Sequence, residues 1–144
     1  MISQAGIYKL DLYENKEVVL TYDSNGDIDS ITSSGDVLNF DTDNNSPELK
    51  NNLESGENNI IINDYEISFH IDSLSQENFD IIEKLQSSIY GYIPVFEFMD
   101  GQKYIINIPF KPVIKKVNSQ VSHTFDITLN PSIKTIEELQ LYLP

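Results

Sequence analysis

Hydrophobic and polar residues alternate along most of the chain, which is the pattern of strands with one buried face and one face in water. The alternation is cleanest over residues 64–72 and 121–129. The expected inward-facing sets are Tyr65, Ile67, Phe69 and Ile71 in the first run, and Val121, Phe125, Ile127 and Leu129 in the second. Residues 7–14 and 17–22 alternate as well, and Asn15-Lys16 between them predicts a hairpin.

One segment, residues 75–90, has helical periodicity instead. Its apolar residues recur at spacings of three and four and form a single stripe. The stripe consists of Phe79, Ile82, Leu85 and Ile89. Ser73 or Ser75 is placed to cap the N-terminus, and Gly91 follows the end. We expect this helix to lie on the sheet and to close one side of the core.

Two segments follow the helix. "YIPVFEFM" (92–99) and "QKYIINI" (102–108), joined by Asp100-Gly101, predict a second hairpin. Pro94 should push the first of these strands toward a sheet edge or a bulge, because proline lacks the N–H that a central strand donates. The terminal "TIEELQLYL" (135–143) contains a capping-box pattern and is compatible with a short C-terminal helix.

These elements predict a mainly β protein of the α+β class. We expect an antiparallel β-sandwich or barrel-like sheet with one packed helix at about 75–90. A length of 144 residues suits one domain over 1–144 with a single core. Residues 41–59 are rich in asparagine, serine and acids, and we expect a long polar loop there, of the kind that is usually functional or mobile.

The charge is strongly negative and uneven. The chain has 23 acids and nine bases, all of them lysine, for a net charge of −14. Residues 1–72 hold fifteen acids and three lysines, a net of −12, whereas residues 73–144 have a net of −2. Without arginine there is no bidentate reader of guanine, and this surface repels duplex DNA. We therefore expect no sequence-specific nucleic-acid binding.

Other broad classes are also disfavoured. The chain has no cysteine, so it has no disulfides and no thiolate ligands. The N-terminus lacks the pattern of a signal peptide, and no apolar run approaches the roughly 20 residues of a membrane helix. We expect a protein that is neither exported nor inserted in a membrane.

The stretch "TYDSNGDIDSI" (21–31) raises the question of calcium, because oxygen-bearing side chains occupy alternate positions. However, the sixth loop position, which should be glycine, is Ile28, and the twelfth, which should be glutamate, is Ser34. A second candidate loop that starts at Asp41 fails the same two tests. Asn25-Gly26 instead predicts a tight type I′ hairpin turn, so we expect no metal site here.

Catalytic signatures are absent from the sequence. His70 and His123 have no nucleophile or third ligand at a suitable spacing, and the glycines are too scattered for a phosphate-binding loop. The carboxylates are so numerous that some pair will stand at a catalytic separation by chance. We therefore expect no catalytic residues, no cofactor and no metal.

The one basic cluster lies in "PFKPVIKKV" (109–117). These lysines are either guards of a strand edge or a patch that complements the acidic half of an identical subunit. We also expect sheet edges and the polar 41–59 segment to join the subunits. The candidate subunit-contact residues are Asp41, Asp43, Glu48, Lys111, Lys115 and Lys116. Head-to-tail stacking would give a heterologous interface, and a ring where the rotation closes.

The segments "SSIYGYIPVFEFMDGQKYIINIPF" and "VSHTFDITLNP", within about 60–131, resemble small structural proteins of tailed bacteriophages. The likeness is to tail-tube, ring and head–tail connector proteins, including the tail-barrel rings of crAss-like phages. It lies in the order of the elements, a helix leading into a hairpin and a final alternating strand, and no invariant residue carries over. The resemblance implies a β-sandwich with one packed helix, whose copies form a ring around a DNA channel.

The expected function is therefore that of a non-enzymatic virion structural protein, a ring subunit assembled in the host cytoplasm with copies of itself and neighbouring virion proteins. DNA could pass an acidic lumen without sticking. The alternative is a small β-sandwich binding module for carbohydrate or for a calcium-assisted ligand, in which some of the eight tyrosines stack on sugars. A ring subunit self-associates without ligand, whereas a binding module is a monomer that its ligand stabilises.

Overall fold

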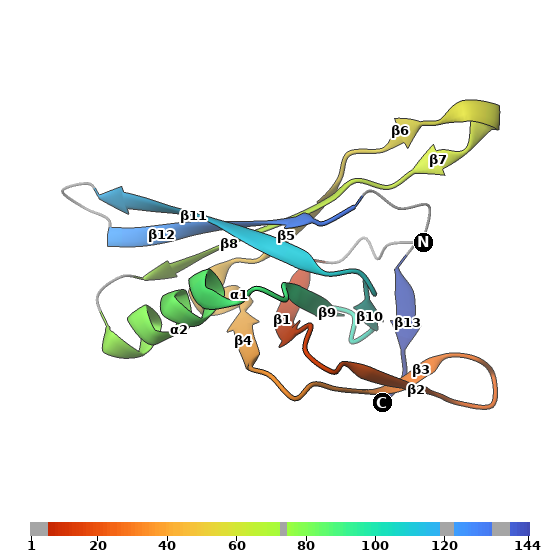
Figure 1. Ribbon diagram of the computed structural model, residues 1–144, viewed down its shortest axis with the longest axis horizontal. Helices are drawn as coiled ribbons and strands as arrows, with labels where there is room; N and C mark the ends of the chain where they lie inside the picture. The colour runs from red at the N-terminus through yellow and green to blue at the C-terminus, as the bar shows by residue number, and fades with distance from the viewer. Residues whose placement is uncertain (1–5, 73–74, 119–122, 134–138) are drawn as a thin grey trace.

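The computed structural model describes residues 6–72, 75–118, 123–133 and 139–144 (Figure 1). The helical elements are α1 (Thr42–Asn45), the 3-10 turn η1 (Glu57–Asn59) and α2 (Gln76–Ser87). The strands are β1 (Ile7–Glu14), β2 (Val19–Tyr22), β3 (Ile28–Thr32), β4 (Val37–Asp41), β5 (Glu48–Asn51), β6 (Glu54–Ser55), β7 (Ile61–Ile62), β8 (Tyr65–Asp72), β9 (Tyr92–Phe98), β10 (Lys103–Ile105), β11 (Phe110–Asn118), β12 (His123–Pro131) and β13 (Gln140–Tyr142).

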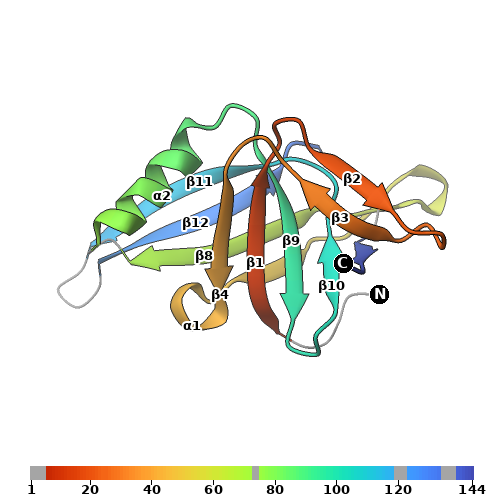
Figure 2. The same cartoon turned by 90° about the horizontal axis from the view of Figure 1, so that it is seen from below.

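Eleven strands form one sheet in the order β2-β3-β13-β10-β9-β11-β12-β8-β5, with β1 paired to β9 and β4 paired to β1. The pairing is antiparallel except between β13 and β3. The sheet folds over itself, so that β4, β1, β9 and β10 make a first layer and β11, β12, β8 and β5 make a second layer behind it (Figure 2). This sandwich-like, β-rich arrangement confirms the predicted fold class.

The main core lies between the two layers. Leu10, Leu12 and Phe96 of the first layer, and Ile67 and Leu129 of the second, are fully buried. The alternation in 64–72 is confirmed, because its four predicted inward residues are all buried. The prediction for 121–129 is confirmed at its three described inward positions, and Val121 lies outside the described residues.

Strand β9 is buried on both faces, which explains the nearly continuous apolar run "YIPVFEF". Its second face, with Ile93 and Val95, packs in a smaller cluster beside Ile105, Ile28 and Ile31. The expected edge position of this strand is therefore wrong, since β9 pairs with β1 on one side and with β10 on the other.

Pro94 is tolerated in this central strand because its nitrogen faces the point where the pairing of β9 with β10 ends. The Pro94 carbonyl accepts a bond of 3.3 Å from the N–H of Ile106, just past the end of β10. In an antiparallel ladder, the N–H and C=O of one residue point to the same side. The missing donor therefore faces the end of the β10 ladder, and the longer β1–β9 pairing is unaffected.

The predicted hairpin of 7–14 with 17–22 is wrong, whereas the hairpin of β9 with β10 is confirmed. Strand β1 lies between β4 and β9, and β2 pairs with β3. After β1 the chain turns away through Glu17, whose φ is +50°. The physical reason is burial, because Leu10 and Leu12 are covered only when β1 is in the middle of the first layer.

The turn at residues 23–27 is confirmed as a hairpin turn between β2 and β3, but its type differs. Gly26 has a φ of +85°, while Asn25 is not left-handed, so a type I turn is followed by a left-handed glycine. The Gly26 N–H donates to the carbonyl of Asp23 at 3.1 Å. The Asp23 carboxylate accepts from the N–H groups of Asn25 and Asp27, so the first residue of the possible calcium loop fixes the turn.

Helix α2 is confirmed, with the Ser75 hydroxyl accepting from the N–H of Asn78 at 3.2 Å. Ile82 and Leu85 are buried, and Phe79 meets the ring of Phe125 edge-on. Ile89 lies past the end of the helix and is 75% exposed, so the stripe is shorter than expected. No helix in the described part of the chain is long and apolar enough to cross a membrane.

Two expectations for polar segments are corrected. Residues 41–59 are not one long loop, since they form α1, β5, β6 and η1, and β5 pairs with β8 from Glu48 to Asn51. The predicted C-terminal helix is wrong in its described part, where Gln140–Tyr142 is strand β13. Three residue pairs join β13 to β10, and this pairing takes precedence over the local helical pattern. The rest of the expected helix, 135–138, lies outside the described residues.

Candidate subunit-contact site

The second layer carries opposite charges at its two edges. Lys111 and Lys115 project from β11, and Glu48 projects from β5 at the far side of the layer. Residues two apart in a strand share a face, so both lysines flank Val113, which is 60% exposed. Val113 is in register with Thr128, then Ser68, then Glu48, which places the lysines and Glu48 on one outer face.

Within the described residues neither Lys111 nor Lys115 forms an ion pair, although Asp126 stands opposite Lys115 in the β11–β12 register. Lys84 and Lys103, by contrast, are each close to a carboxylate. The backbone of Lys116 continues β11 opposite Phe125, and its side chain lies outside the described part.

Asp41 and Asp43 lie apart from Glu48. They border a hollow of about 430 Å³ between α1, β8 and the start of α2, whereas Glu48 borders another hollow of about 370 Å³. The Asp41 carboxylate accepts from the N–H of Asn44 at 2.8 Å, and this hydrogen bond lowers the pKa of Asp41. Asp41 is therefore a helix cap, and the structure does not gather the three predicted acids into one patch.

A projecting β-ribbon is the feature that sequence reasoning missed. Strands β6 and β7 and the turn η1 form an arm, defined as residues 52–63, which extends from one end of the molecule (Figure 1). The arm continues the β5–β8 hairpin beyond the body of the sheet. Three consecutive isoleucines at 60–62, just after the expected loop of 41–59, are the residues that could have indicated a strand here.

The base of the arm is fixed by hydrogen bonds. The Asn51 side chain donates to the Asn63 side-chain oxygen at 3.0 Å and accepts from the N–H of Asp64 at 3.0 Å. The N–H of Asn52 donates to the carbonyl of Asp64 at 2.9 Å. Asn63 is only 5% exposed although it is polar. These hydrogen bonds join the two strands where the β5–β8 hairpin continues into the arm.

The arm exposes large aliphatic side chains. Leu53 is 63% exposed and Ile61 is 61% exposed. Alternation places both on the same face of the ribbon, since Ser55 is paired with Ile61 and Leu53 stands two residues before Ser55. The exposed Glu57 lies at the tip. Exposed apolar side chains gathered on a projection are typical of an interaction surface.

A groove separates α2 from β11. In the described chain, β11 pairs with β9 only at Phe110, and beyond that residue α2 runs beside it (Figure 2). The groove has a volume of about 350 Å³. Its lining residues are Leu85, Gln86, Ser88, Lys111, Pro112 and Ile114. Leu85 is buried and Lys111 is exposed. The floor of the groove is therefore apolar, and its rim carries a positive charge.

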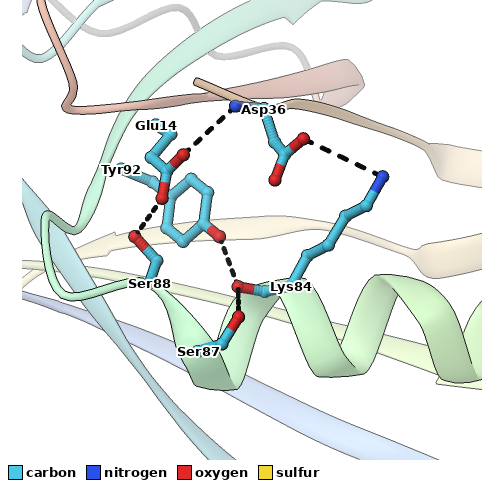
Figure 3. Close-up of polar contacts among 6 residues, drawn as sticks. All are labelled: Glu14, Asp36, Lys84, Ser87, Ser88 and Tyr92. Carbon is cyan, nitrogen blue, oxygen red and sulfur yellow. Dashed lines mark hydrogen bonds and ion pairs between the residues drawn. The ribbon is translucent and has the colours of Figure 1, made fainter. Parts of the chain in front are cut away.

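One wall of the groove, the last turn of α2, is held by a polar network (Figure 3). The Glu14 carboxylate accepts from the Ser88 hydroxyl at 2.6 Å and from the N–H of Asp36 at 3.2 Å. The Tyr92 hydroxyl donates to the Lys84 carbonyl at 2.8 Å. Burial, helped by the charge of Glu14, raises the pKa of Tyr92 to about 12, so this hydroxyl keeps its proton.

The groups of this network hold the helix end against β1 and β9. Among the residues that the structure describes, no three histidine or acidic side chains converge as metal ligands. Comparison of the chain with protein-family models, curated proteins and solved structures finds no match. The resemblance to phage tail proteins thus rests on element order and stays a prediction.

Proposed function

We propose that this protein is a non-enzymatic assembly subunit that joins copies of itself, as a ring component of a bacteriophage tail or head–tail connector does. The observation that carries the proposal is the arm, with Leu53 and Ile61 exposed on one face. Full burial of a leucine or isoleucine side chain contributes about 1.5–3 kcal/mol. Covering these two residues in a neighbouring subunit therefore favours association.

The distribution of charge supports the same proposal. Copies with a net charge of −14 repel one another unless a basic surface meets an acidic one. Lys111 and Lys115 offer such a surface on β11, which is separated from Glu48 of β5 by the two strands β12 and β8. An interface between unlike surfaces is heterologous and gives a ring where the rotation closes. The net −12 of residues 1–72 would let DNA pass a ring without adhering.

A ligand-binding module is the second candidate, and it has weaker support. Stacking on a sugar requires aromatic rings gathered on one surface. The most exposed tyrosines, Tyr8, Tyr22 and Tyr90, lie on β1, on β2 and after α2. The hollow on the outer face of the second layer, lined in part by His70 and Asp126, is the alternative place for a small polar ligand.

The test is the mass of the purified protein by light scattering across protein and salt concentrations, with and without calcium and simple sugars. We expect a discrete multimer, or a mass that grows with protein concentration, and indifference to calcium and sugar. A monomer whose melting temperature rises with calcium or with a sugar would favour the binding module. A monomer that responds to neither would contradict self-assembly.

A further inference from the structure

We propose that the arm of one copy docks in the groove between α2 and β11 of the next copy. Leu53 and Ile61 would lie against the apolar floor of the groove, and Glu57 would lie near Lys111 and Lys115. This inference rests on the proposed function and names the two surfaces through which the subunits join.

The positions of the two surfaces favour contact between copies. The arm projects from one end of the long axis, whereas α2 and the β11–β12 hairpin extend toward the other end, in both views (Figures 1 and 2). The arm is also tied to the body at its base by the Asn51–Asn63 hydrogen bond. It therefore cannot fold back into the groove of its own chain. Each copy offers one arm and one groove, so the contact is head-to-tail.

The chemistry of the two surfaces is complementary. The groove combines apolar atoms of Leu85, Pro112 and Ile114 with a lysine at its rim. The arm combines an exposed aliphatic face with an exposed acid at its tip. Basic and acidic surfaces steer association and fix the orientation of partners, while the apolar contact supplies affinity.

The backbone of β11 is a further reason for choosing this groove. Beyond Phe110, the side of β11 that faces away from β12 has no partner strand in the described chain. Open strand edges attract other strands unless something covers them. The arm is a two-stranded ribbon whose outer edges can approach β11 beside α2.

The experiment uses two defective full-length variants. The arm variant is Leu53→Asp with Ile61→Asp, and the groove variant is Lys111→Glu with Lys115→Glu. All four side chains are exposed, so both variants should fold, which a circular dichroism melt checks. A matched control, Lys9→Glu with Lys16→Glu, has the same net charge as the groove variant and changes exposed lysines outside the arm and the groove.

We expect each defective variant to be monomeric at concentrations where the wild type and the control assemble. A mixture of the two should form a 1:1 dimer and stop there, because it combines one intact arm with one intact groove. The mass from light scattering distinguishes the outcomes. If both variants assemble like the wild type, this interface is wrong and the proposed function stands. If the wild type is monomeric at every concentration, both proposals fail.

A second measurement does not depend on disrupting the interface. The chain has no cysteine, so Ile61→Cys protein can be mixed with Gln86→Cys protein, in which the new thiol stands in the groove, and oxidised gently. We expect a disulfide-linked heterodimer within minutes, formed at least tenfold faster than in a control mixture with Tyr22→Cys in place of Gln86→Cys. Equal rates in the two mixtures would overturn the proposed docking.

Discussion

At the scale of single residues, Glu14 joins the sheet to the end of α2. Its carboxylate accepts hydrogen bonds from the Ser88 hydroxyl and the Asp36 N–H. Bonds to a charged acceptor contribute about 1.5–3 kcal/mol where they are shielded from water. We expect Glu14→Ala to lower the free energy of unfolding by about 1–3 kcal/mol, because two donors lose their acceptor.

Urea denaturation followed by circular dichroism measures this loss. Glu14→Gln should be milder than the alanine variant, since its amide oxygen still accepts a bond. Glu83→Ala, an exposed position on the same helix, is the matched control and should change little. Equal stability of Glu14→Ala and Glu83→Ala would show that the network does not hold the helix end.

A second residue-scale prediction concerns Asp11. Burial raises the pKa of its carboxyl above the ordinary 3.8, and Glu97 adds to the shift, while Lys9 and Lys103 oppose it. A raised folded-state pKa means that ionisation disfavours the fold. This carboxyl therefore favours folding fully below about pH 3.8, and the contribution is lost as pH rises through the raised pKa.

We expect Asp11→Asn, which resembles the protonated form, to be more stable than the wild type at pH 7. The difference in the free energy of unfolding should shrink as the pH is lowered toward the ordinary carboxyl range. Urea midpoints across this pH series provide the measurement. Asp126→Asn, at an exposed position in β12, is the control and should change the free energy of unfolding little at pH 7. A difference that grows toward acid would contradict the burial argument.

At the scale of elements, the arm depends on its base. Asn51 holds both Asn63 and the backbone of Asp64, so Asn51→Ala should loosen the arm while the core strands remain paired. Hydrogen exchange reports such local opening. We expect amides of the arm to exchange about tenfold faster, and those of the central part of β8 to keep their rates. Faster exchange throughout β8 would mean that the arm and the body unfold together.

The elements that the sequence predicted are those whose pattern is local. Periodicity located β8, β12 and α2, and turn residues located the β9–β10 hairpin. The errors concern pairing between distant segments, which the local pattern does not encode. Strand β5 has four residues, and only Leu49 packs against the core. Its sequence therefore shows no alternation that would predict a strand. In β13 the pairing to β10 took precedence over a helical pattern.

Part of the candidate subunit-contact site was predictable, because the spacing of residues along one strand is also a local pattern. The spacing of Lys111 and Lys115 is that of residues on one face of a strand, and in the structure both lie on the outer face of β11. Asp41 could not be recognised as a cap, because α1 is four residues long and has no periodicity. The arm was missed because its two strands are two residues each, which is too short for a pattern.

At the scale of the whole molecule, one arm and one groove per copy make assembly a chain of identical head-to-tail contacts. The groove variant Lys111→Glu with Lys115→Glu keeps its arm, so it can join one end of a growing assembly and then offers no groove. It should therefore act as a terminator. Because each terminator stops one chain, its effect should depend on its ratio to the wild type.

We expect the average mass of the wild-type assembly to fall as the groove variant is added, and to approach that of small oligomers at a 1:1 ratio. A closed ring gives a sharper result, since one terminator prevents closure and the discrete ring mass should give way to open chains. Light scattering after co-refolding the two proteins measures the change. The charge-matched variant Lys9→Glu with Lys16→Glu should leave the mass unaltered, and an equal fall with both variants would assign the effect to net charge instead of to the groove.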